Sequence, residues 1–220
     1  MEEEGIYYFF EHEDAMHRAV ILDSKSSHEP IKGESNILYL PPNPQQNQPQ
    51  DIVNTFNLHQ EIHPGRYMLQ EYDFKKPGND MRVQSRPEIE IGHAKPAYEM
   101  YDFPGGYDAH AEGENYVGAR MEELSTKSLV FSGSGALRRF HVGQRFKLTG
   151  HPREDHNTDY LILTTEYEFI DPPYESGGTA SSYSCRFTAI RAAQQYRPPR
   201  VTPRPLIHGI QSALVTGPAG

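Results

Sequence analysis

Hydrophobic and polar residues alternate along much of this 220-residue chain, in short runs that turn residues separate. Such a period of two, with many β-branched and aromatic residues, is typical of half-buried β-strands. It predicts strands at residues 5–11, 18–23, 54–58, 66–74, 81–91, 129–132, 145–149, 160–169 and 183–190. The 14 Tyr and 10 Phe, with no Trp, also suit a sheet-rich protein. The pattern therefore predicts a mainly β fold.

The first two apolar runs, residues 5–11 and 18–23, are joined by a polar, turn-like stretch. Two such runs around a turn predict a β-hairpin. Bulky apolar side chains alternate onto both faces of the first run, so neither face is polar. We therefore expect both faces of the hairpin to be covered.

One segment has a helical period instead. Val117, Met121 and Leu124 lie at i, i+4 and i+7 and form one apolar stripe. This spacing predicts a helix over about 112–127, with its clearest part at 114–124. A single helix among antiparallel strands that turns separate favours a small β-barrel.

The ends of this helix also carry signals. Asp108 and His110 are the candidates for capping its first turn. Glu123 and Lys127 are one turn apart in the favourable order, which predicts an ion pair on the helix surface.

A segment rich in proline and arginine follows the last predicted strand. Its prolines fix φ and remove backbone donors, so neither a helix nor a central strand can form there. We expect an extended, semi-rigid strut over 195–205. Its arginines are expected to pair with acidic surfaces of neighbouring subunits. The candidate structural linker residues are Arg197, Pro198, Pro199, Arg200, Pro203, Arg204 and Pro205.

A second apolar run, residues 206–215, follows the strut. It is predicted to be the first strand of a further domain that is missing. The sequence is therefore expected to be a piece of a longer protein.

Charge and composition narrow the functional classes. The net charge is −9, and residues 1–100 hold 17 acids against 9 bases, which disfavours nucleic acid as a partner. No apolar run approaches the roughly 20 residues of a membrane helix, and the acidic start at 1–4 does not resemble a signal peptide. Cys185 is the only cysteine, so no internal disulfide can form and a reducing compartment is expected.

The histidine pairs are weak metal candidates. His59 and His63 have the i, i+4 spacing of a zincin, but Glu61 stands in the wrong position and Pro64 breaks helical geometry. We therefore expect no metal there.

Two further pairs, His12 with His17 and His151 with His156, lie in polar stretches predicted to be turns. They are interpreted as solvated surface histidines.

No catalytic constellation is found. The stretch 133–136 lacks the third glycine of a dinucleotide fingerprint and is predicted to be a turn. Cys185 lies in a strand-like run, where a thiol is usually a small buried hydrophobe. We expect no catalytic, cofactor-binding or metal-binding residues and no enzyme activity, and hence a structural scaffold.

Three stretches resemble one known family. Residues 196–205 read Tyr-Arg-Pro-Pro-Arg-Val-Thr-Pro-Arg-Pro, and 207–211 and 215–220 continue with Ile-His-Gly-Ile-Gln and Val-Thr-Gly-Pro-Ala-Gly. This resembles the junction in VgrG proteins, the trimeric spike-tip proteins of bacterial type VI secretion, which are akin to phage tail hubs. Residues 3–12 and 101–107 are similar to two further signatures, in family order.

The resemblance implies a β-rich α+β fold of antiparallel β-barrel domains of phage tail hub type. Residues 1–30 would end an intervening hub subdomain. Residues 31–95 would be part of the first barrel, with a Pro/Gln-rich loop at 41–50. Residues 97–192 would form the second barrel with its helix, and 193–220 the linker and first strand toward a missing oligosaccharide-binding-type (OB-fold) domain.

The resemblance also implies a function: the hub portion of a type VI secretion spike, which links the tail tube to the membrane-puncturing tip for effector delivery. The implied partners are two more copies in a homotrimer, an Hcp-like tail-tube protein, and spike-tip and effector proteins. No cofactor, nucleic acid or stable membrane insertion is expected. The protein would be assembled in the bacterial cytoplasm and then secreted.

Two other functions stay open. The chain could be a phage tail or baseplate hub attached to a cell-wall-degrading lysozyme domain. It could instead be a carbohydrate-binding β module, whose aromatic residues should then form an exposed platform.

Overall fold

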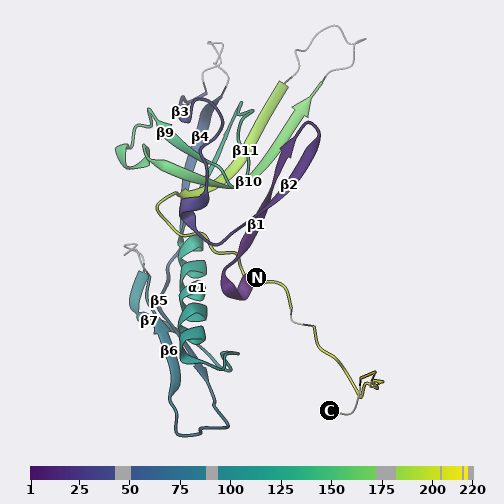
Figure 1. Cartoon of the computed structure of the whole chain (residues 1–220). Helices are drawn as coiled ribbons and strands as arrows, with labels where there is room; N and C mark the ends of the chain where they lie inside the picture. Colours follow the sequence, from purple (N-terminus) through teal and green to yellow (C-terminus); the bar gives the residue numbers. More distant parts are fainter. Residues whose placement is uncertain (43–50, 88–93, 172–181, 204, 215, 218–220) are drawn as a thin grey trace.

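The computed structural model describes the chain except for residues 43–50, 88–93, 172–181, 204, 215 and 218–220 (Figure 1). The fold is mainly β with one long helix, as predicted. The strands are β1 Tyr7–Glu13, β2 Met16–Leu22, β3 Asn36–Tyr39, β4 Ile52–Gln60, β5 His63–Glu71, β6 Met81–Ser85, β7 Ala94–Asp102, β8 Leu129–Gly135, β9 Arg145–Thr149, β10 Asp159–Ile170 and β11 Ser182–Arg191. The helix α1 is His110–Ser128, and short 3-10 turns are η1 Glu2–Glu4, η2 Lys25–Ser27 and η3 Glu154–His156.

Six strands close a barrel in the order β10-β11-β8-β4-β3-β9. Most pairs are antiparallel, but β3 is parallel to both β4 and β9. Phe131, Phe140, Phe146 and Tyr160 fill the interior and are at most 1% exposed. Cys185 is also fully buried there, as predicted, and burial raises the pKa of its thiol to about 11.

The barrel takes strands from both sides of the predicted division near residue 96, since β3 and β4 pair with strands that follow α1. Hydrophobic periodicity predicts whether a segment is a helix or a strand, but it does not predict which strands pair with each other. The domain boundaries themselves stay a prediction.

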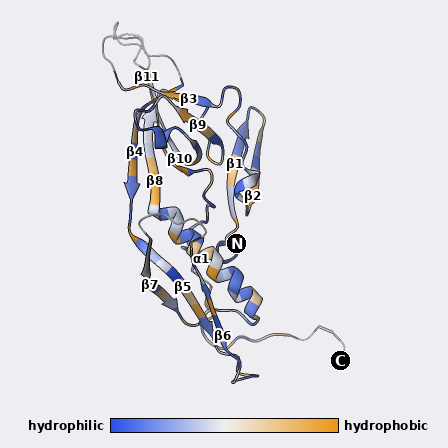
Figure 2. Cartoon of the chain, turned by 90° about the vertical axis from the view of Figure 1, so that its left-hand side faces the viewer, coloured by the Kyte–Doolittle hydropathy of each residue, from blue (hydrophilic) through white to orange (hydrophobic). Residues whose placement is uncertain are grey.

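A three-stranded sheet, β6-β5-β7, forms the second layer with α1 on one face (Figure 2). The predicted helix is confirmed: Val117 and Met121 are 1% exposed, and Leu124 is partly buried against the same cluster. The sequence missed β7, because its residues were placed at the start of the next unit. Among the described residues, no helix is long and apolar enough to cross a membrane.

The predicted surface pair on α1 is present, with Lys127 Nζ 3.1 Å from Glu123 Oε1. The predicted cap is not. The helix begins after Ala109, which makes no side-chain capping bond, while a Glu112 carboxylate oxygen accepts the Asp108 N–H at 3.2 Å. A carboxylate from inside the first turn therefore fulfils part of the role expected of Asp108 or His110.

The two layers are joined where two chain segments cross together. Strand β4 leaves the barrel at Gln60 and continues as β5 from His63, while α1 passes into β8 at Leu129 without a loop. Gln60 is paired with Leu129, and the Glu61 N–H donates to the Ser128 carbonyl oxygen at 3.0 Å. This double crossing, in which one segment is hydrogen-bonded to the other, fixes the helix relative to the barrel.

The hairpin β1–β2 is confirmed, with a tighter turn than predicted because the strands extend to Glu13 and Met16. Within the described residues only one face of the hairpin is covered, so cover for the second face stays an expectation. Tyr7 is buried on one face, but Tyr8, Phe10 and Ile21 on the other are 61%, 52% and 62% exposed. The hairpin lies beside the barrel and offers only one face to it (Figure 1).

The predicted turn at 133–136 is wrong at its glycines, which belong to strand β8. A Cβ atom at Gly135 would lie 2.0 Å from the Ile52 carbonyl oxygen, and one at Gly133 would lie 2.4 Å from the Phe187 ring. Strand β4 has a register shift between Val53 and Thr55 at this place. The glycines thus allow a close approach of two strands.

We predict opposite effects for two glycine-to-alanine changes. Gly135→Ala should destabilise the protein by about 3 kcal/mol or more, because its methyl group overlaps the β4 backbone. Gly118→Ala should stabilise by about 1 kcal/mol, because a Cβ atom there meets nothing within 4 Å and alanine is the better helix former. Urea unfolding of both variants measures this, and equal midpoints would contradict the close-approach explanation.

Candidate functional site

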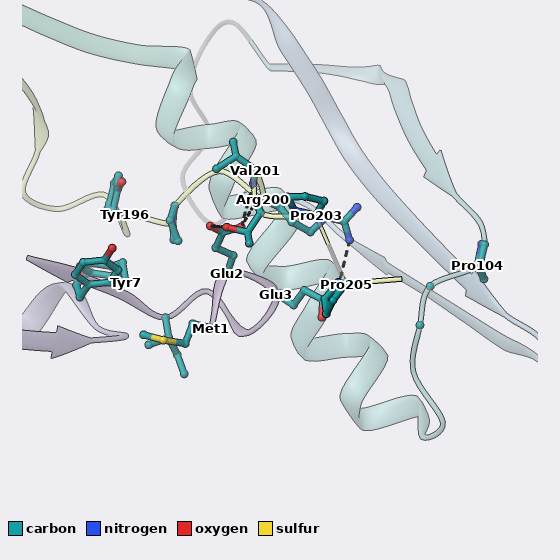
Figure 3. Close-up of a pocket in the computed structure, with 16 residues that line it drawn as sticks. Met1, Glu2, Glu3, Tyr7, Pro104, Tyr196, Arg200, Val201, Pro203 and Pro205 are labelled. Carbon is teal, nitrogen blue, oxygen red and sulfur yellow. Dashed lines mark hydrogen bonds and ion pairs between the residues drawn. The ribbon is translucent and has the colours of Figure 1, made fainter. Parts of the chain in front are cut away.

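The strut, residues 195–205, has neither helix nor strand in its described part, as its prolines predict. After β11 it passes α1 and reaches the N-terminal turn η1 (Figure 1). Strut residues, the N-terminal segment and the loop at 104–106 line a groove of about 870 Å³ (Figure 3). Arg204 of the predicted linker set lies outside the described residues.

Arg197 is the centre of the contacts that hold the strut. Its Nε donates to Glu122 Oε2 of α1 at 2.6 Å. Its Nη1 donates to the carbonyl oxygens of Gly5 and Asp23 at 2.9 and 2.8 Å. The Arg197 side chain is 17% exposed. One guanidinium therefore joins the strut to the helix, to the N-terminal turn and to the end of the hairpin.

Two glutamines before Arg197 extend this contact, and sequence analysis did not identify either of them. Gln194 is 5% exposed and donates to the Ser125 carbonyl oxygen at 2.5 Å, near the end of α1. Gln195 accepts the Lys25 N–H at 2.9 Å. Neutral amides in a polar stretch follow no periodicity, so only the fold reveals that they are docked.

A chain of contacts leads from the strut to the barrel. Tyr196 meets Tyr7 of β1 edge to face, with ring centroids 4.9 Å apart. The Tyr7 hydroxyl donates to His28 Nε2 at 2.7 Å, and His28 Nδ1 donates to the Gly143 carbonyl oxygen at 2.8 Å. Burial raises the pKa of Tyr7 to about 12 and lowers the pKa of His28. Both shifts favour the neutral side chains, which are the forms that these hydrogen bonds require.

The far part of the strut is held by Glu2. Its carboxylate accepts the N–H groups of Val201 and Thr202, both at 3.0 Å, and the Thr202 hydroxyl at 2.7 Å (Figure 3). These bonds, with the Thr202 backbone first, lower the pKa of Glu2. Proline has no N–H, so between Pro199 and Pro203 the backbone offers three donors, and Glu2 accepts from the two at Val201 and Thr202.

Two strut arginines lie near acids of the same chain, Arg197 near Glu122 and Arg200 near Glu3. The expected pairing with acidic surfaces of neighbouring subunits stays a prediction. Arg200 Nη1 lies 3.8 Å from Glu3 Oε1, a long and exposed contact compared with that of Arg197. The short segment between the two arginines lies along α1 and η1, which carry the matching acids Glu122 and Glu3.

The predicted strand after the strut is absent from the described residues. Leu206, Ile207, Ile210 and Leu214 are between 75% and 104% exposed, in a segment that runs away from the body (Figure 1). A strand needs a neighbour for its N–H and C=O groups, and no other described segment pairs with this one.

The histidine candidates are distributed over separate places. His59 Nε2 is 2.9 Å from Ser132 Oγ, and His63 Nδ1 is 2.8 Å from the Pro64 carbonyl oxygen, so the zincin-like pair does not converge. Within the described residues no three His, Cys, Asp or Glu side chains gather around a metal position. His156 was interpreted as solvated, but it is 3% exposed and packs 5.5 Å from the Phe131 ring. That interpretation is wrong because the turn folds over the end of the barrel core.

Comparison with known proteins gives one consistent result. Residues 1–173 match the family described as phage tail baseplate hub (GPD). Two type VI secretion system spike proteins of Pseudomonas aeruginosa, VgrG1b and VgrG1a, are 36% and 35% identical over 222 aligned residues and cover 100% of this chain. The chain in turn covers 30% and 34% of those proteins, so it spans about a third of their length.

Solved structures share the fold at low sequence identity. The E. coli c3393 protein, a component of the type VI secretion system, superposes with a TM-score of 0.54 at 15% identity, over 94% of this chain and 40% of its own. The 43 kDa tail protein of prophage MuSo2 from Shewanella oneidensis gives 0.54 at 10% identity, over 87% and 52%. Both likenesses concern the fold alone.

We predict that Arg197→Gln destabilises the docked strut far more than Arg200→Gln. The first change removes three hydrogen bonds, to the Glu122 carboxylate and to the carbonyl oxygens of Gly5 and Asp23, and should cost about 2 kcal/mol. The second removes a long, exposed ion pair and should cost less than about 0.5 kcal/mol. Urea unfolding and amide hydrogen exchange at Val201 and Thr202 measure the difference. Equal exchange rates in both variants would contradict the central role of Arg197.

Proposed function

Because the chain belongs to the phage tail baseplate hub family, we propose that it is the structural hub portion of a type VI secretion spike. In this role it links the tail tube to the membrane-puncturing tip for effector delivery. The observation that carries the proposal is the similarity to spike proteins along the whole chain, the strut included. The chain spans about a third of the length of those relatives, so the role is proposed for the whole protein and not for this chain alone.

The docked strut supports a mechanical role. Arg197 and Glu2 fix two points of the strut on the helix and the N-terminal turn. Between these points lie Pro198 and Pro199, whose fixed φ limits how far the chain can bend or extend. Axial force on the tip would therefore pass to the base with little slack.

The domain division keeps the form that the family resemblance implies. Residues 1–30 end an intervening hub subdomain, residues 31–95 are part of the first barrel, residues 97–192 form the second barrel with its helix, and residues 193–220 lead to an OB-fold domain. The pairing of β3 with β9 and of β4 with β8 adds that strands of both middle segments share one closed barrel. In the assembled hub the segment 206–215 would become a strand once a partner edge is present.

The proposed state is a homotrimer. Tyr8, Phe10 and Ile21 form an exposed apolar face on the hairpin, and Phe169 and Ile170 of β10 are 66% and 55% exposed. Contiguous exposed apolar surface of this kind favours burial against other subunits. The further partners are an Hcp-like tail-tube protein, spike-tip proteins and effectors, without nucleic acid or stable membrane insertion.

The proposed activity is structural and not enzymatic. The relatives found by sequence are spike proteins. This favours a structural spike role over a phage hub with an attached lysozyme domain and over a carbohydrate-binding module. The proposed location is the bacterial cytoplasm during assembly, followed by export with the spike.

We predict that the purified chain sediments and scatters light as a trimer near 75 kDa, three times the 25.0 kDa of one copy. Replacing Tyr8, Phe10 and Ile21 together by Ser should shift the mass toward 25.0 kDa, because the exposed hairpin face would no longer favour association. Exposed His110→Ser on the helix is the control and should keep the trimer. A monomeric wild-type chain would contradict self-assembly of this portion.

We predict that proline-to-glycine changes in the strut impair secretion in the bacterium that encodes the protein. The change is made at Pro198, Pro199, Pro203 and Pro205, which gives the strut the flexibility of glycine. Release of the tail-tube protein into the medium is measured, and we expect it to fall at least about tenfold, because a slack strut transmits less force. The control replaces Pro77 and Pro152, two exposed turn prolines, and should secrete normally. Normal secretion by the strut variant would overturn the mechanical role.

A further inference from the structure

The turn end of the β1–β2 hairpin brings two imidazole groups together. His12 of β1 and His17 of β2 are directly opposite in the antiparallel register. Their Nδ1 atoms are 2.7 Å apart and their ring centroids 4.8 Å apart, and both side chains are exposed. The sequence pattern placed both residues in a turn, but the strands extend further and turn the two histidines into a cross-strand pair.

This spacing is close to what two ligands of one metal ion need. With metal–nitrogen bonds of about 2.0–2.1 Å, two imidazole nitrogens on neighbouring coordination positions are about 2.9–3.3 Å apart. The Nδ1 atoms at 2.7 Å need to separate by only a few tenths of an ångström. Small rotations of two exposed side chains provide that movement, while the paired backbone holds the rings on one face.

The surrounding charges are mixed. Glu11 is paired with Arg18, and Glu13 Oε1 lies 3.4 Å from Lys32 Nζ, so both nearby carboxylates already have a cationic partner. Among the described residues no third His, Cys, Asp or Glu completes the group. The site therefore offers two nitrogen ligands, and water must supply the remaining positions.

We propose that His12 and His17 form a two-imidazole site for a divalent first-row transition ion. Imidazole suits zinc, nickel and copper, and a site of given ligands binds copper(II) most tightly among them. The bound ion would join β1 to β2 beside the turn at 14–15 and so stiffen the projecting end of the hairpin. Nothing in the hub role requires this ion, so the proposal stands apart from the proposed function.

The test is a titration of copper(II) into the full chain, purified without a histidine tag, followed by calorimetry and electron paramagnetic resonance. We expect one ion per chain with a two-nitrogen signature. His12→Ala and His17→Ala should each weaken binding by about tenfold or more, because the second imidazole acts at high effective concentration. His208→Ala changes a single exposed histidine in the C-terminal segment and should leave binding unchanged.

Hydrogen exchange gives an independent readout of where the ion acts. Copper(II) should slow amide exchange between residues 11 and 18 in the wild-type chain and in His208→Ala, and in neither hairpin variant. Circular dichroism confirms that each variant keeps the β-rich fold. Binding by His12→Ala or His17→Ala that equals the wild type overturns the proposal, and so does copper binding that leaves hairpin exchange unchanged.

Discussion

The contact of Arg197 with three separate segments is the interaction on which the arrangement of this chain depends. Its guanidinium meets a side chain of α1, a carbonyl of the N-terminal turn and a carbonyl at the end of the hairpin. A mostly buried cation is tolerated only when its donors are paired, so the three partners must stay in place together. This one residue therefore joins the strut, the hairpin and the helix, and the contacts of Gln194, Gln195 and Glu2 add to it.

The double crossing between barrel and helical layer gives this contact a rigid base. Gln60 and Leu129 are paired where β4 leaves the barrel and β8 enters it. Gln194 binds the last turn of α1 at the same place, through the Ser125 carbonyl oxygen. Three passages of the chain thus meet at the end of one helix. The strut is thereby joined to the barrel and to the sheet at one place, through the Gln194 side chain and the backbone hydrogen bonds of the crossing.

The exposed surfaces complement this interior. The barrel core is closed and filled by aromatic side chains, whereas the outer hairpin face and the end of β10 leave large apolar side chains in solvent. A single copy has no further described segment to cover them. Among the described residues of the strut, Arg197 and Arg200 have their acidic partners in the same chain.

The sequence by itself determined the types of element. It predicted the hairpin, the helix with its Val117 and Met121 stripe, and the extended strut. Each prediction depends on neighbouring residues only: the alternation of apolar residues in a strand, the apolar stripe of a helix and the fixed φ of proline. It also showed the family through motifs at both ends and in the middle of the chain.

Only the tertiary structure decided which elements pair and which charges meet. The glycines of β8 were predicted as a turn but lie in a strand that β4 approaches closely, and His12 and His17 were predicted in a turn but stand opposite each other in paired strands. Arg197 finds Glu122 across 75 residues of sequence. Such contacts depend on which distant segments the fold brings together, and local sequence patterns do not show that.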